Sequence, residues 1–216
     1  AARALRKALA AAEPPHPSAA AMRVALANLD AAAGRTRAAA LGYKQVLDGP
    51  ENGPELAPAA YNLGLLELAA GDRNGARARF LEVLDRGPGS RLADVARGWL
   101  GRTYLDGDDP AAARQWFRTA ADAKTKEAAS AGALGVCLCD LLTGDDDAAR
   151  ERLADAKFST REAHAAVAGC FTALLRYRAA PTDSRRELLL ASLSACDDAR
   201  RLGPGEGHVI ADLALE

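Results

Sequence analysis

The chain has 216 residues, a formal net charge of −1 and an aromatic content of only 5%. This near-neutral charge argues against a nucleic-acid-binding protein, which needs a basic patch or stripe. No apolar run approaches the roughly 18 residues of a membrane-spanning helix, so we expect no membrane insertion. The length suits one large domain or a continuous array, and the many alanines predict a core of closely packed helices.

The first 13 residues are predicted to form a helix that corresponds to the second half of a preceding repeat unit. Ala8-Leu9 lies 38 residues before Val46-Leu47, and Pro14 then ends the helix. The chain begins with Ala1 rather than Met and shows no signal-like apolar segment, so we expect a fragment or a processed chain. Its targeting region is therefore expected to be missing, and the compartment stays open between cytoplasm and periplasm.

A repeat of 36–37 residues runs through the middle of the chain. The small residue of each predicted second helix recurs as Ala39, Ala76, Ala113 and Ala149. The large residue four positions later recurs as Tyr43, Phe80, Phe117 and Leu153. The turn position recurs as Gly34, Gly71, Asp108 and Gly144, and the first helices carry Leu26-Ala27, Leu63-Gly64, Leu100-Gly101 and Val136-Cys137. We predict one array whose units are 20–56, 57–93, 94–129 and 130–158.

The second unit resembles the tetratricopeptide repeat. Leu63-Gly64 falls on its first helix, Gly71 in its turn, Phe80 on its second helix and Pro88 after it, which is the layout of that signature. The resemblance implies an all-α, right-handed superhelical solenoid of helix-turn-helix units. Each unit exposes one apolar face that only stacking can bury.

A longer, degenerate helical pair is predicted over residues 159–202. Ser159 to Glu162 forms a capping-box pattern that opens a helix through about Arg178, and Pro181 interrupts it. A second capping pattern begins at Ser184. The remaining segment, 203–216, is predicted to be a tail or cap.

No catalytic, cofactor or metal constellation emerges, so we expect neither an enzyme nor a cofactor. His164 falls within a helix, where a structural or surface role is expected. The two aspartate clusters, 106–109 and 145–147, lack the ligand set of a calcium loop and are expected to serve turns and helix caps. The four cysteines show no metal-site spacing and are expected to be small core residues: Cys137, Cys139, Cys170 and Cys196.

The concave face lined by the first helices is the surface expected to bind a protein or peptide partner. Helical spacing places on it Asn28, Tyr61, Asn62, Leu65, Trp99, Arg102 and Leu138. Asn62 could equally reflect the repeat consensus, and Trp99 could equally be a core residue. We expect Asn62→Ala or Arg102→Glu to weaken partner binding while leaving thermal melting nearly unchanged.

Two families of tetratricopeptide proteins bear on the partner. Chaperone-binding members grip a carboxylate with two Asn and several cations, and Asn28 and Asn62 occupy similar sites. The cationic sites hold Val24, Val95 and Trp99 instead, so such a co-chaperone is rejected. The chain around the start of the third unit resembles bacterial envelope proteins such as the Tol-Pal-associated coordinator and outer-membrane assembly lipoproteins. The residues that carry this resemblance are Pro88, Ser90, Ala96, Trp99-Leu100-Gly101 and Tyr104.

The sequence therefore predicts a non-catalytic protein-protein interaction scaffold. The alternative is a regulatory or substrate-presenting segment of a larger multidomain enzyme. Self-association through the ends of the array is a third possibility.

Overall fold

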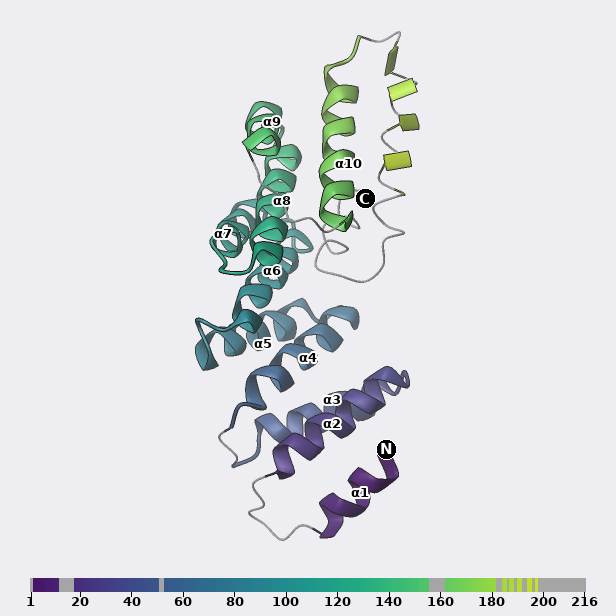
Figure 1. Ribbon diagram of the computed structural model, residues 1–216, viewed down its shortest axis with the longest axis vertical. Helices are drawn as coiled ribbons and strands as arrows, with labels where there is room; N and C mark the ends of the chain where they lie inside the picture. Colours follow the sequence, from purple (N-terminus) through teal and green to yellow (C-terminus); the bar gives the residue numbers. More distant parts are fainter. Residues whose placement is uncertain are drawn as a thin grey trace. The chain divides into compact units, whose positions relative to one another are not determined.

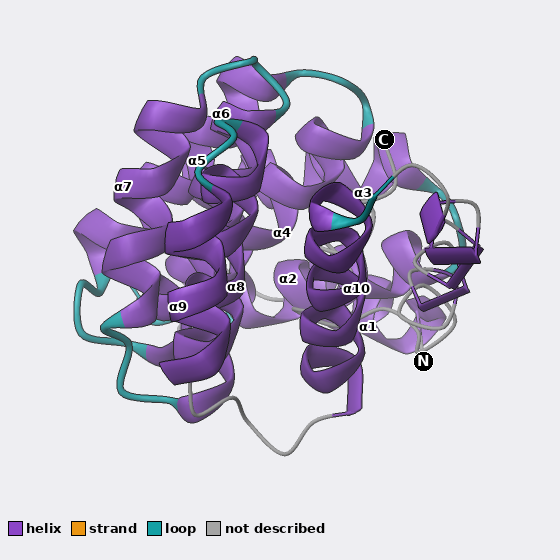
Figure 2. Cartoon of the chain, turned by 90° about the horizontal axis from the view of Figure 1, so that it is seen from above, coloured by secondary structure: helices purple, strands orange, loops and turns teal. Residues whose placement is uncertain are grey.

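The computed structural model describes residues 2–11, 18–50, 53–155, 162–181 and individual positions between 184 and 197. Figure 1 shows its ten labelled helices: α1 (Ala2–Ala11), α2 (Ala19–Ala32), α3 (Thr36–Leu47), α4 (Leu56–Ala69), α5 (Arg73–Arg86), α6 (Arg91–Leu105), α7 (Pro110–Ala121), α8 (Lys126–Leu142), α9 (Asp146–Asp155) and α10 (Glu162–Ala179). All regular structure in these described ranges is helical (Figure 2), which confirms the predicted all-α class. None of the described helices is long and apolar enough to cross a membrane.

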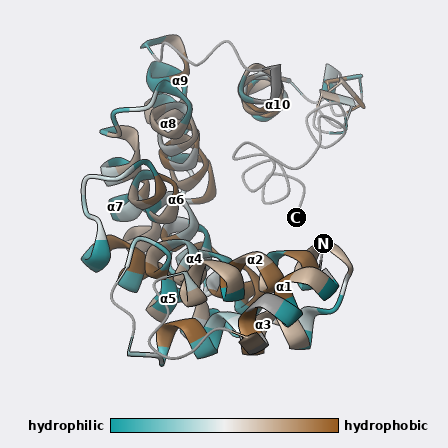
Figure 3. Cartoon of the chain, turned by 60° about the horizontal axis from the view of Figure 1, so that its bottom comes forward, coloured by the Kyte–Doolittle hydropathy of each residue, from teal (hydrophilic) through white to brown (hydrophobic). Residues whose placement is uncertain are grey.

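The helices form two compact units, Ala1–Ala96 and Arg97–Glu216, and the division falls inside α6. In the first unit, α2 packs on α3, α3 on α4, and α4 on α5. In the second unit, α7 packs on α8, and α10 packs on both α8 and α9. Helices such as α1 carry both hydrophobic and hydrophilic residues, drawn brown and teal in Figure 3, as expected of an amphipathic helix.

The turns between paired helices follow the predicted turn positions. Gly34, Gly71 and Gly144 have φ of 71°, 82° and 77°, and Asp108 has φ of 56°. This left-handed conformation lets the next residue's N–H reach back to the helix it follows, as Asp72 N–H does to the Glu67 carbonyl at 2.8 Å. The same pattern closes all four turns and ends each first helix at the same point of its unit.

Aspartates begin most of the second helices. The Asp72 carboxylate accepts from Gly75 N–H, and Asp109 accepts from Ala112 N–H, both at 2.9 Å. Asp145 likewise accepts from Ala148 N–H at 3.1 Å. These bonds satisfy amides that a helix start leaves unpaired. They confirm the predicted capping role of Asp109 and Asp145.

An aromatic ring packed on glycine forms the centre of the repeat unit. In the first compact unit a Cβ on Gly64 would come within 2.9 Å of Phe80 Cε1, and Phe80 is fully buried. In the second unit the Phe117 ring lies against Gly101 and Gly135, so glycine covers it from two helices. The predicted pairing of a small residue with an aromatic is thus present in both units.

The C-terminal helix α10 runs from Glu162 to Ala179, as the capping pattern predicts. Arg178 docks its end: Nη1 donates to the Leu141 carbonyl at 3.0 Å and pairs with Asp146 at 2.7 Å. Residues 156–161, the helix predicted to end at 202 and the segment 203–216 lie outside the described residues, except for the individual positions between 184 and 197.

Candidate functional site

Two asparagines from different first helices meet in the first compact unit. Asn62 Nδ2 on α4 donates to Asn28 Oδ1 on α2 at 3.0 Å. The hydroxyl of Tyr43, on α3, donates to the same Asn28 oxygen at 2.5 Å. Tyr43 is buried whereas Asn28 is exposed, so the network links the core to the surface. Burial raises the pKa of Tyr43, and the nearby Asn62 side chain opposes the shift.

Tyr61 and Leu65 flank Asn62 on α4. Both side chains are half-buried. The Tyr61 ring packs on Phe80 with a centroid separation of 6.0 Å and a tilt of 58°. We call the four residues Asn28, Tyr61, Asn62 and Leu65 the α2–α4 surface. It combines two side-chain amides with the half-buried ring of Tyr61 and the half-buried side chain of Leu65.

The three predicted contacts of the second compact unit differ in accessibility. Trp99 is half-buried. Arg102 Nε donates to Asp106 Oδ1 at 2.7 Å, and the two side chains are only 18% and 16% exposed. Arg102→Glu would bring two carboxylates together at this site, so we expect this variant to lower the melting temperature as well as to weaken partner binding.

Leu138 is not available to a partner. It is only 3% exposed and belongs to the hydrophobic core of the second unit. Helical spacing alone misplaces it because α8 is covered by α7, α9 and α10.

Sequence reasoning missed a set of acidic residues that link neighbouring helices. Asp30, Glu67 and Asp140 occupy the same position of three units and are mostly buried. Their spacing of 37 residues and then 73, twice the repeat, is a signal that could have found them. Each pairs with a cation of the preceding helix: Arg6 at 3.5 Å, Lys44 at 3.8 Å and Arg114 at 2.9 Å.

Asp140 is the most deeply buried of these three carboxylates. Its carboxylate is 2% exposed and lies 2.9 Å from Arg114 and 3.0 Å from Arg152. Glu67 is held more loosely, with Arg79 at 3.9 Å. Burial raises the pKa of Glu67 although Arg79 and Lys44 act in the opposite direction. The acidic position therefore joins α7, α8 and α9 by a strong ion triplet and α3, α4 and α5 by a weak one.

The described cysteines and His164 are buried. Burial raises the pKa of Cys137 and of Cys139 to about 12, which leaves both as neutral thiols. Cys170 is 1% exposed and disulfide-bonded, which corrects the expectation of a simple core thiol, and Cys196 lies outside the described residues. His164 is fully buried in α10, in keeping with a structural role. Among the described residues no His, Cys, Asp or Glu cluster could hold a metal ion.

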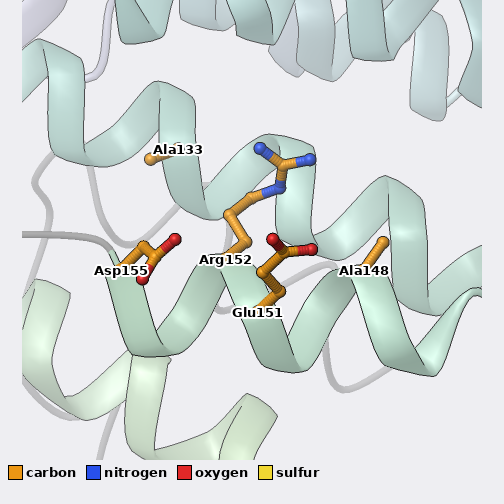
Figure 4. Close-up of a pocket in the computed structure, with 5 residues that line it drawn as sticks. All are labelled: Ala133, Ala148, Glu151, Arg152 and Asp155. Atoms are coloured by element: carbon orange, nitrogen blue, oxygen red, sulfur yellow. The ribbon is translucent and has the colours of Figure 1, made fainter.

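A surface hollow of about 460 Å³ lies along α9 in the second compact unit, lined by Ala133, Ala148, Glu151, Arg152 and Asp155 (Figure 4). Arg152 reaches from this rim to Asp140 on α8, so its guanidinium already has a partner. Glu151 and Asp155 are exposed. The hollow is lined by two solvent-exposed carboxylates, two alanines and an arginine that is already paired, so we assign no function to it.

Comparison with known proteins places the fold. No family model matches the sequence, and no curated protein does. Several solved structures do match. One is YrrB, described as a tetratricopeptide protein with an unusual peptide-binding site. Its sequence is 19% identical, the TM-score is 0.60, and the match covers 98% of this chain and 97% of YrrB. PilF of Pseudomonas aeruginosa shares 21% identity with a TM-score of 0.63 over 93% of this chain and 82% of its own.

A third structure, a tetratricopeptide repeat protein from Parabacteroides merdae, shares 14% identity with a TM-score of 0.52 over 100% of this chain and 91% of its own. At these identities the likeness shows the fold. The chain thus has the tetratricopeptide fold, an all-α helical-repeat architecture, as its sequence predicts.

Proposed function

We propose that this chain is a non-catalytic scaffold that binds a peptide or protein segment on the α2–α4 surface. The observation that carries the proposal is the meeting of Asn28 and Asn62 at 3.0 Å from two first helices. The fold that the chain shares with YrrB, itself described as having a peptide-binding site, supports the same class of function.

The two amides suit the backbone of an extended segment. Asn28 keeps its NH2 group, and Asn62 keeps its carbonyl oxygen, after the bonds within the network are made. Peptide units need both donors and acceptors, and each such bond contributes a net of about 0.5–1.5 kcal/mol. Tyr61 and Leu65 add apolar contact beside the amides. Trp99 and Arg102 belong to the second compact unit and stay predicted contacts of that unit alone, and Leu138 is left out because it is buried.

The proposal is tested with an array of short random-sequence peptides probed with the purified, labelled chain. The peptides that bind most tightly are then measured in solution against the wild type, Asn28→Ala and Asn62→Ala. We expect each variant to lose about fivefold to tenfold in affinity, as the loss of one amide hydrogen bond implies.

The matched control is Gln45→Ala, which removes an exposed amide from α3 of the same compact unit. Its affinity and thermal melting should equal those of the wild type. Peptides that bind the wild type and both asparagine variants equally would exclude the α2–α4 surface as the binding site.

A further inference from the structure

The faces of α2 and α4 that carry the two asparagines hold no charged residue. At the helical spacing that places residues on one side of a helix, α2 carries Ala21, Val24, Ala25, Asn28, Ala31 and Ala32, of which Val24 is buried in the core. The corresponding positions of α4 are Pro58, Tyr61, Asn62, Leu65, Leu68 and Ala69. Ten of these twelve side chains are apolar or carry only a phenol, and the other two are the asparagine amides. No group on this face can neutralise a charge on a ligand.

The network around Asn28 also fixes which of its groups faces outward. Its carbonyl oxygen accepts from both Tyr43 and Asn62, so its acceptor capacity is used inside the protein. The Tyr43 hydroxyl is anchored by a ring that is 1% exposed. The group that Asn28 can offer a ligand is therefore its NH2, a hydrogen-bond donor.

We propose that the ligand of this surface is an uncharged, apolar segment inside a polypeptide, with a backbone carbonyl that accepts from Asn28. This inference rests on the proposed function and specifies its partner. A charged side chain or a terminal carboxylate would be taken out of water with no opposite charge beside it, which is costly. Tyr43 is a positioning residue: it does not touch the ligand but holds the Asn28 amide with its donor outward.

The ligand class is tested with synthetic variants of the best array peptide. The parent has an amidated C-terminus and no charge; its variants carry a central Glu, a central Lys or a free terminal carboxylate within the contact region. We expect each charge to weaken binding by about tenfold or more, because the face cannot pair it. Binding of the uncharged parent should change by less than about twofold between low and high salt, since no ion pair is screened.

The role of Tyr43 is tested with Tyr43→Phe, which keeps the ring and removes the hydroxyl. We expect the affinity for the parent peptide to fall by about fivefold, comparable to the loss of one hydrogen bond. In NMR spectra the side-chain NH2 resonances of Asn28 should shift in this variant. Tyr177→Phe, on α10 of the other compact unit, is the control and should leave affinity and the Asn28 resonances unchanged.

The outcomes separate this inference from the proposed function. If no peptide binds through Asn28 and Asn62, both fail. If peptides bind there but the charged variants bind as tightly as the parent, the scaffold function stands and the ligand class is wrong. If Tyr43→Phe binds like the wild type and the Asn28 resonances do not move, the positioning role is wrong.

Discussion

Replacing Gly101 by alanine tests the packing on which the repeat depends. A Cβ at this position would lie 2.6 Å from Phe117 Cε1 and 2.7 Å from Cδ1. The ring cannot move aside, because it is 1% exposed and a Cβ on Gly135 would also collide with it. Such overpacking costs about 1–3 kcal/mol, whereas alanine in place of glycine favours a helix by about 1 kcal/mol. We therefore expect Gly101→Ala to lower the free energy of unfolding by up to about 2 kcal/mol.

Gly98→Ala is the matched control in the same helix. A Cβ there would meet no atom within 4 Å, so only the helix preference remains and this variant should be more stable than the wild type. The difference between the two variants in urea unfolding, followed by circular dichroism, cancels the preference and isolates the overpacking, about 1–3 kcal/mol. Equal stability of Gly101→Ala and Gly98→Ala would refute the assignment of Phe117 to the space beside Gly101.

Four other predictions concern charge, thiols and turns. Asp140→Asn should destabilise by up to about 3–5 kcal/mol in urea unfolding, because it leaves two partly buried arginines without their carboxylate. Glu67→Gln should not destabilise the protein. The pKa of Glu67 is raised in the native state, so the native state binds this proton more tightly than the unfolded state, and the free energy of unfolding falls as pH rises through that pKa. Near pH 7 the free energy of unfolding of the variant should therefore equal or exceed that of the wild type. Cys137 and Cys139 should react with a disulfide reagent at about pH 8 only after unfolding, because burial raises the pKa of both to about 12; rapid reaction of the native protein would contradict this. Gly71→Ala should lower the free energy of unfolding by about 1–2 kcal/mol, because the φ of 82° at this position disfavours residues with a side chain. A clash is not the cause, since a Cβ there meets no atom within 4 Å. An unchanged melting temperature would contradict the turn geometry.

The fold could be predicted because the repeat encodes it several times. Gly34, Gly71, Asp108 and Gly144 stand at one position of the period, and all have a positive φ. The pairing of Gly64 with Phe80 and of Gly101 with Phe117 follows from the same alignment. Turn geometry and close helix contact depend on residues within one unit, which is why a single sequence reveals them.

The candidate site was only partly predictable because it depends on contacts between units. Spacing places Asn28 and Asn62 on the same kind of helix face, but only the structure brings Tyr43 to Asn28 Oδ1 at 2.5 Å. Leu138 satisfies the same spacing and is buried, because helical period says which side of a helix a residue occupies and not what covers that side. The sequence predicts that Arg102 offers its charge to a partner, yet the charge is paired with Asp106, which lies four residues further along the chain, just after α6 ends.

The central claim is that the α2–α4 surface binds a peptide segment, and chemical-shift mapping tests it most directly. The isotopically labelled chain is titrated with the best array peptide, and backbone and side-chain amides are followed. The account predicts that the largest shifts fall on Asn28, Tyr61, Asn62 and Leu65, with the side-chain NH2 of Asn28 among them. Shifts confined to α8 and α9, around the hollow at Glu151 and Asp155, with α2 and α4 unchanged, would contradict it.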